Sequence, residues 1–109
     1  MMEQDVYELL TKTELPVYPV KIPEEVVLPA ISYMVVAGNK KQNLDTSYFA
    51  EVKRFQVDIW AKSYKEVKDI SENIFVLLNE IVAQDITMMD LYEDKVDVYR
   101  VMIDFYFKQ

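Results

Sequence analysis

The apolar pattern of the chain predicts an α+β domain: a mostly antiparallel sheet backed by one long helix, in the order α-β-β-β-α-β-β. Two segments carry apolar residues at every second position, the period of a half-buried strand. A stretch between them lacks glycine and proline and repeats apolar residues at helical spacing. Because strands pair with hairpin neighbours and only two helices are expected, α+β is favoured over a parallel α/β sheet.

The first part of the chain predicts a short helix and then an extended edge. Residues 5–12 carry apolar side chains at helical spacing, which is typical of a short amphipathic helix. Residues 15–22 are interrupted by prolines, which favours an edge strand or an extended connector over a central strand. Residues 24–29 are expected to form a loop, because Pro29 disfavours helical geometry at Leu28.

The next segments predict two strands separated by a polar stretch. Residues 30–37 are rich in β-branched and aromatic side chains and predict a strand buried on both faces. Residues 38–47 are polar and predict a loop or the tip of a long projecting hairpin, a place where function is often found. Residues 49–61 alternate strictly and predict a half-buried strand. Its core set is Phe55, Val57, Ile59 and Ala61, and its outward set is Arg54, Gln56, Asp58 and Trp60.

The second half predicts a helix and a final hairpin. Ser63 and Glu66 form a capping-box pattern at the start of a helix expected over residues 63–84, roughly 30 Å long at 1.5 Å per residue. Its apolar stripe requires a sheet beneath it. A strand is expected over 86–92, a turn over 93–95 and the last strand over 96–108. The last strand is expected to turn Tyr99, Val101, Ile103, Phe105 and Phe107 inward and Arg100, Met102, Asp104 and Tyr106 outward.

Composition excludes several kinds of chemistry. The chain has 109 residues, enough for one domain spanning residues 1–109, and 51% of them are hydrophobic. It contains no histidine, no cysteine and a single glycine, Gly38. A Cys or His zinc site, a Ser-His or Cys-His nucleophile and a glycine-rich phosphate cradle are therefore excluded. Binding by surfaces, with no cofactor, is the expected mode of action.

Charge and the N-terminal sequence limit the partners. The formal net charge is −7, whereas binding of nucleic acid needs a basic patch, and the pair Lys40 and Lys41 is too small to supply one. No secretory signal and no membrane-length apolar run is visible, so folding in the cytoplasm without a membrane partner is expected.

Carboxylates are the only potentially catalytic groups present in quantity. Glu93, Asp94 and Asp97 cluster near a turn, and Glu24 and Glu25 form another pair. Paired carboxylates can perform acid–base chemistry or hold Mg²⁺ or Ca²⁺. Acidic residues are ordinary in turns, however, and no EF-hand spacing occurs. No catalytic residue and no metal site is therefore predicted.

The outward faces of the two alternating strands are more informative. If these strands are neighbours, Arg54 and Arg100 can pair across them with Asp58 and Asp104. Trp60, Met102 and Tyr106 share this face and are costly to leave in water. Two interpretations follow for these three residues: a subunit interface, or a core covered by another segment, for which the opening helix is the candidate.

Several local patterns together resemble a known family. They are Val6–Leu10 in the opening helix, Val17–Pro19 in the proline-containing piece, Leu28–Tyr33, and Phe55–Ala61 followed by Ser63 and Tyr64. With the helix and final hairpin that follow, nearly the whole chain resembles the tail completion, or tail terminator, proteins of long-tailed bacteriophages and their prophage relatives.

The resemblance implies a structural protein with no catalysis and no cofactor. It implies a ring, usually of six copies, that caps the finished tail tube, stops its polymerisation and offers the surface for head-tail joining. The implied partners are other copies of the chain, the major tail tube protein and a head-completion or connector protein. Assembly in the host cytoplasm and a final place at the virion's tail-head junction follow. Loop residues implied to contact the tube or the neighbouring subunit are Lys40, Lys41, Gln42, Asn43 and Asp45.

An acidic chain suits such a ring, because DNA must pass through it without specific binding. Two other functions stay open. One is another head-tail connector or minor capsid protein, which shares size and charge. The other is a small ligand-binding module or enzyme with a carboxylate-lined pocket.

Overall fold

A computed structural model describes residues 2–43, 48–81, 83–93 and 97–108, and no structure is assigned here to the rest. The elements are α1 (Met2–Thr11), β1 (Val17–Pro19), β2 (Ala30–Asn43), β3 (Tyr48–Ala61), α2 (Tyr64–Glu80), β4 (Gln84–Glu93) and β5 (Val98–Lys108). This order is the predicted α-β-β-β-α-β-β. The strands form one five-stranded sheet in the order β1-β2-β3-β5-β4.

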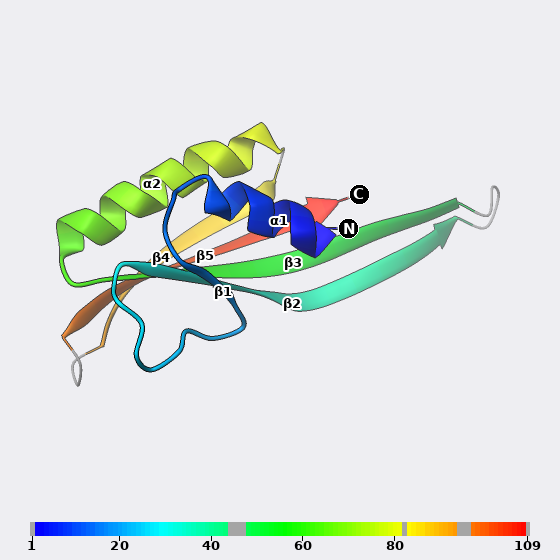
Figure 1. Ribbon diagram of the computed structural model, residues 1–109. Helices are drawn as coiled ribbons and strands as arrows, with labels where there is room; N and C mark the ends of the chain where they lie inside the picture. The colour runs from blue at the N-terminus through cyan, green and yellow to red at the C-terminus, as the bar shows by residue number, and fades with distance from the viewer. Residues whose placement is uncertain (1, 44–47, 82, 94–96, 109) are drawn as a thin grey trace.

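The sheet is mostly antiparallel, as predicted. The short edge strand β1 runs parallel to β2, and every other neighbouring pair is antiparallel. Both helices lie on the same face of the sheet, with α2 across the middle and α1 beside it (Figure 1). The opposite face carries no helix, and we call it the open face.

The core lies between this helical layer and the sheet. The inward sets predicted for β3 and β5 are confirmed: Phe55, Val57, Ile59 and Ala61 have no exposed surface, and neither do Val101, Ile103 and Phe105. Phe55 and Phe105 stack with ring centroids 5.5 Å apart. Buried residues of α1 and α2 complete the cluster, namely Val6, Leu9, Leu10, Val67, Ile74 and Leu78.

The helix α2 begins as predicted and ends earlier. The Ser63 hydroxyl accepts a hydrogen bond of 3.1 Å from the Glu66 backbone N–H, which confirms the cap. The helix has 17 residues, about 26 Å at 1.5 Å per residue, so the expectation of a helix to residue 84 is wrong. The Ile81 and Ala83 N–H groups both bond to the Leu78 carbonyl, which closes the helix before β4 starts.

The strand β2 differs from the prediction in burial and in length. Its first residues are buried, but Val36 is 42% exposed, so burial on both faces holds only at the start. The strand continues to Asn43, past an irregularity between Val35 and Ala37, and stays paired with β3 as far as Asn43 opposite Tyr48. Residues 38–43 are therefore strand, as in a projecting hairpin, and not loop. The polar sequence of residues 38–43 has no apolar alternation that would predict a strand. The segment is a strand because its backbone pairs with β3, and this pairing does not depend on the side chains.

The final hairpin agrees with prediction apart from its ends. The strand β4 extends the expected 86–92 to Gln84–Glu93, and β5 spans Val98–Lys108. Glu93 ends β4 instead of opening a turn, and the other residues of the expected turn lie outside the described part of the chain.

Candidate assembly surfaces

Charged pairs cross the open face between β3 and β5, as the sequence predicts for neighbouring strands. An Arg54 guanidinium nitrogen lies 2.9 Å from an Asp104 carboxylate oxygen, and Arg100 lies at the same distance from Asp58. The hydrogen bond to Asp104 raises the pKa of Arg54. The two pairs bind β3 to β5 across the face opposite the core.

Asp58 is the more protected of the two carboxylates, with its side chain 8% exposed. Its charge is compensated by hydrogen bonds from the Arg100 Nε, at 3.0 Å, and the Gln56 side-chain amide, also at 3.0 Å. A buried carboxylate is tolerated when donors surround it in this way. Asp58 therefore acts as a fixed polar centre on the open face.

Trp60 lies beside this centre. The Arg100 guanidinium sits over its ring, 4.7 Å from the centroid, as in a cation–π contact. The indole Nε1 is buried and has no hydrogen-bond partner among the described residues. Trp60 is half-buried and lines a cavity together with residues of the 20–28 loop, which lies below the sheet (Figure 1).

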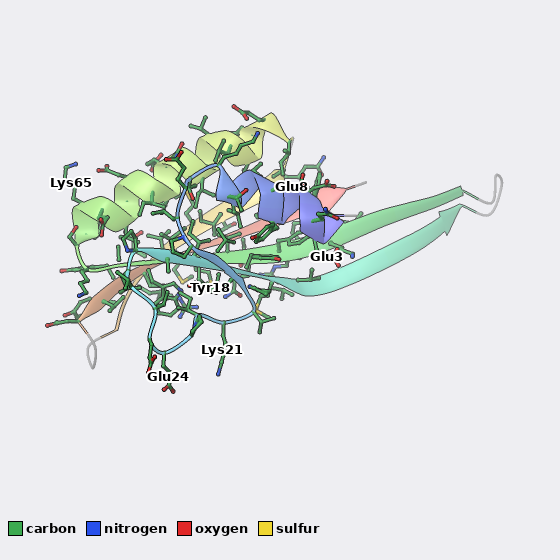
Figure 2. All side chains as sticks on the ribbon, in the orientation of Figure 1. Glu3, Glu8, Tyr18, Lys21, Glu24 and Lys65 are labelled. Atoms are coloured by element: carbon green, nitrogen blue, oxygen red, sulfur yellow. The ribbon has the colours of Figure 1, made fainter. Side chains whose placement is uncertain are left out.

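The expectation that the opening helix covers Trp60 is wrong, because α1 packs on the other face of the sheet, within the core. The 20–28 loop takes that place and leaves a cavity of about 570 Å³ over the sheet. Lys21 and Glu24 of this loop point away from the sheet (Figure 2). The apolar lining of the cavity is Val20, Ile22, Val26, Leu28, Met34, Trp60 and Val98.

Met102 and Tyr106 lie on the open face of β5 with Trp60 nearby on β3, so the structure brings the three predicted residues onto one face. Trp60 pairs with Arg100 across the ladder and Met102 pairs with Asp58. Tyr106 is 39% exposed and Met102 is half-buried. Their role as a subunit interface stays a prediction.

One further member of this surface has no clear signal in the sequence. Met89 of β4 is 48% exposed and lies opposite Met102 in the β4–β5 ladder. Adjacent Met88 packs against the core instead. Because Met88 and Met89 are both apolar, the sequence does not indicate which of them points into the core. The register of β4 with β5 decides it.

The β2–β3 hairpin projects from the body of the molecule (Figure 1). Its last partner on β5 is Lys108, which pairs with Val52, so beyond that point β2 and β3 are a two-stranded ribbon among the described residues. Such a ribbon is marginally stable alone in water, which points to a partner. The predicted contact residues in it are Lys40, Lys41, Gln42 and Asn43 on β2, while Asp45 lies outside the described residues.

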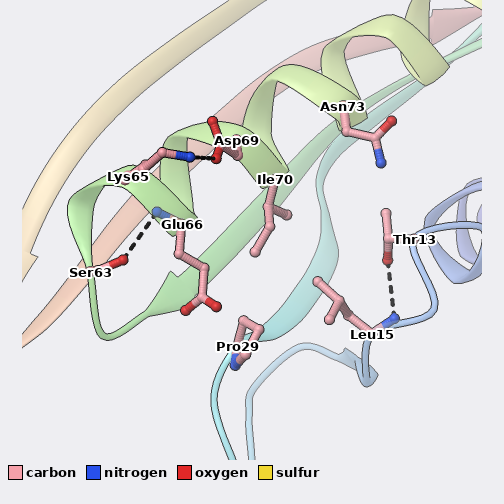
Figure 3. Close-up of a pocket in the computed structure, with 9 residues that line it drawn as sticks. All are labelled: Thr13, Leu15, Pro29, Ser63, Lys65, Glu66, Asp69, Ile70 and Asn73. Atoms are coloured by element: carbon pink, nitrogen blue, oxygen red, sulfur yellow. Dashed lines mark hydrogen bonds and ion pairs between the residues drawn. The ribbon is translucent and has the colours of Figure 1, made fainter.

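A second cavity, of about 430 Å³, lies beside the first turns of α2 (Figure 3). Lys65 and Asp69 pair at 2.8 Å on its rim, and this hydrogen bond raises the pKa of Lys65. Glu66 faces the cavity together with Ile70 and Leu15. The lining therefore holds two carboxylates, Glu66 and Asp69, of which Asp69 is paired with Lys65.

The predicted acidic clusters do not form a metal site within the described residues, where no group of three potential ligands occurs. The Tyr92 hydroxyl donates a hydrogen bond to Asp97, and Glu24 and Glu25 are exposed on the 20–28 loop. None of the described helices is both long enough and apolar enough to cross a bilayer.

Comparison with known proteins gives a likeness in fold and none in sequence. No protein-family model matches the chain, and no curated protein sequence matches it. Among solved structures, a chain of the "Virion of native gene transfer agent (GTA) particle" is similar, with a TM-score of 0.63. The match has 13% sequence identity and covers 93% of this chain and 88% of that chain. The two chains therefore share one fold over almost their whole lengths.

Proposed function

We propose that this chain is a structural protein of a long-tailed phage or phage-derived particle, and that it serves as the tail terminator. In this function a ring of copies, six in the expected assembly, caps the tail tube, ends its polymerisation and offers the surface to which the head joins. The observation that carries the proposal is the fold shared with a chain of a gene transfer agent virion over 93% of this chain. The sequence resemblance to tail terminators adds the specific role.

Two surfaces support an assembly function. The open face presents Met89 and Tyr106 to solvent beside ordered ion pairs, and an exposed apolar patch rimmed by charge is typical of protein interfaces. The β2–β3 hairpin extends beyond the sheet, where it has no partner strand within the described chain. The predicted tube or neighbour contacts at Lys40, Lys41, Gln42 and Asn43 lie on this hairpin.

Deletion of the gene from the phage or prophage that carries it tests the proposal. We expect headless tails whose length exceeds that of the parent, because nothing stops tube growth, and restoration of length and infectivity by the plasmid-borne gene. Negative-stain images give tail length and joining in the same sample. Light scattering on the purified protein gives the mass of any ring.

The alternatives predict different particles. Tails of normal length beside unjoined, DNA-filled heads would assign the chain to a head-tail connector. Normal particles would reject both structural functions and favour a ligand-binding module or an enzyme, for which a ligand-dependent rise in melting temperature is the next measurement.

A further inference from the structure

Among the described residues, two long stretches of sheet edge have no partner strand, and the first belongs to β2. The strand β1 pairs only with Ile31–Tyr33, so residues 34–43 of β2 have no partner strand on that side within the described chain. The ladder with β3 is irregular between Val35 and Ala37 and regular from Ala37 to Asn43, so the free edge presents an even row of backbone N–H and C=O groups from Ala37 onward. Such a row is a template for pairing with another chain.

The second uncovered edge belongs to β4, the last strand in the sheet order. Its ladder with β5 is regular from Thr87 to Glu93, while the register shifts between Gln84 and Thr87, where Asp85 has a positive φ of 53°. An irregularity of this kind protects an edge from pairing. The protection ends at Thr87, and the rest of the edge stays open.

The charges of the two edges are opposite. The β4 sequence contains Asp85, Asp90 and Glu93 and no basic residue, whereas residues 34–43 contain two lysines and no acidic residue. Asp90 already pairs with Lys68 of α2. Pairing of β4 with β4, or of β2 with β2, would bring like charges together, which is unfavourable.

The strand directions also fit. Each step from β2 through β3 and β5 to β4 is antiparallel, so β4 runs opposite to β2. A second copy, rotated so that its sheet continues the first, therefore presents its β2 antiparallel to β4. This is the stronger of the two ladder types, and a head-to-tail contact closes into a ring when the rotation allows.

We infer that β4 of one copy pairs with the free edge of β2, residues 34–43, in the next copy, so that the sheets of neighbouring subunits become continuous. The inference rests on the self-association in the proposed function and names the surface that produces it. It also gives the projecting hairpin a third strand.

Cysteine cross-linking tests the inference, because the chain has no cysteine of its own. Ala37→Cys, which lies opposite Arg54 in the regular part of the ladder with β3, is combined in turn with Thr87→Cys, Met89→Cys or Leu91→Cys, which scans the register. Cysteines bridge only when their Cα atoms lie about 4.4–6.8 Å apart, so one combination is expected to exceed the other two.

Met89→Cys with Val27→Cys is the matched control, because Val27 is 82% exposed on the 20–28 loop and lies off both edges. Under mild oxidation we expect one edge combination to give a ladder of oligomers, roughly tenfold more abundant than in the control. Met89→Cys alone is expected to stay monomeric on denaturing gels. Dimers from this single variant, or no ladder from any of the three pairs, overturn the inference.

The measurement is made on the purified variants at high concentration and on particles from complemented cells. If the variants restore tail length but give no ladder of oligomers, the edge pairing is wrong and the terminator function stands. If the purified protein gives the ladder but deletion of the gene does not change the particles, the terminator function is wrong and the edge pairing stands.

Discussion

Asp58 shows how the open face holds its charges. Its carboxylate is buried and accepts hydrogen bonds from Arg100 and Gln56. Asp58→Asn should lower the free energy of unfolding by about 1.5–3 kcal/mol, because it removes the charge opposite Arg100 from a partly buried pair. Urea unfolding measures the loss. Asp104→Asn is the matched control and should cost less, because its partner Arg54 is 40% exposed; equal losses would contradict the assignment.

Glu3 ties α1 to β3 and makes part of the stability pH-dependent. Its carboxylate lies 2.6 Å from the Lys53 Nζ, and this hydrogen bond lowers the pKa of Glu3 below its ordinary value of 4.5. A lowered folded-state pKa stabilises the fold above pH 4.5, and the contribution disappears as the pH falls through the lowered pKa.

Glu3→Gln should therefore show a smaller drop in melting temperature than the parent between about pH 5 and about pH 3. Glu8→Gln, on the same helix, is the control and should follow the parent. A parent-like pH profile for Glu3→Gln would show that the pair contributes nothing to folding.

At the scale of the elements, the Ser63 side chain caps the start of the helix α2. The Ser63 hydroxyl accepts from the Glu66 N–H at 3.1 Å. Ser63→Ala should lower the free energy of unfolding by about 1 kcal/mol, because a helix N–H loses its acceptor. Ser63→Asp keeps an acceptor and should retain the stability of the parent. Thermal unfolding of the three proteins is the measurement, and a neutral Ser63→Ala would contradict the role of the cap.

The elements differ in how well the sequence predicts them, for physical reasons. The inward sets of β3 and β5 and the ion pairs opposite them follow from strict alternation, because burial of one face fixes the other. The end of α2 carries no glycine or proline signal, so its length depends on where β4 must begin. The polar part of β2 has no apolar period, and its strand structure comes from β3. The segment that lies over Trp60 is the 20–28 loop, and a loop has no periodic pattern of apolar residues from which its position could be predicted.

At the scale of the whole molecule, the hairpin makes the protein elongated. The extents are 54 × 25 × 22 Å and the radius of gyration is 15.2 Å. A compact chain of this length would have about 13 Å. The difference reflects the ribbon of β2 and β3, which projects beyond the rest of the sheet (Figure 1). A segment that extends the molecule in this way, and leaves its own backbone edges uncovered, is suited to contacts with other subunits.

Deletion of residues 40–45 tests this separation of folding from assembly. The shortened protein should keep the melting temperature of the parent within a few degrees, because α1, α2 and the parts of β3 and β5 whose burial is described form a core without these residues. Its radius of gyration in small-angle scattering should fall from 15.2 Å towards about 13 Å. In cells that lack the gene, it should fail to restore tail length.

Lys40→Ser with Lys41→Ser is the control for charge, since it keeps the ribbon and removes only the two cations. Partial restoration by this variant, beside none by the deletion, would assign the contact mainly to the backbone of the ribbon. Full restoration by the deletion would separate the hairpin from tail capping and leave the open face, with Trp60, Met102 and Tyr106, as the assembly surface.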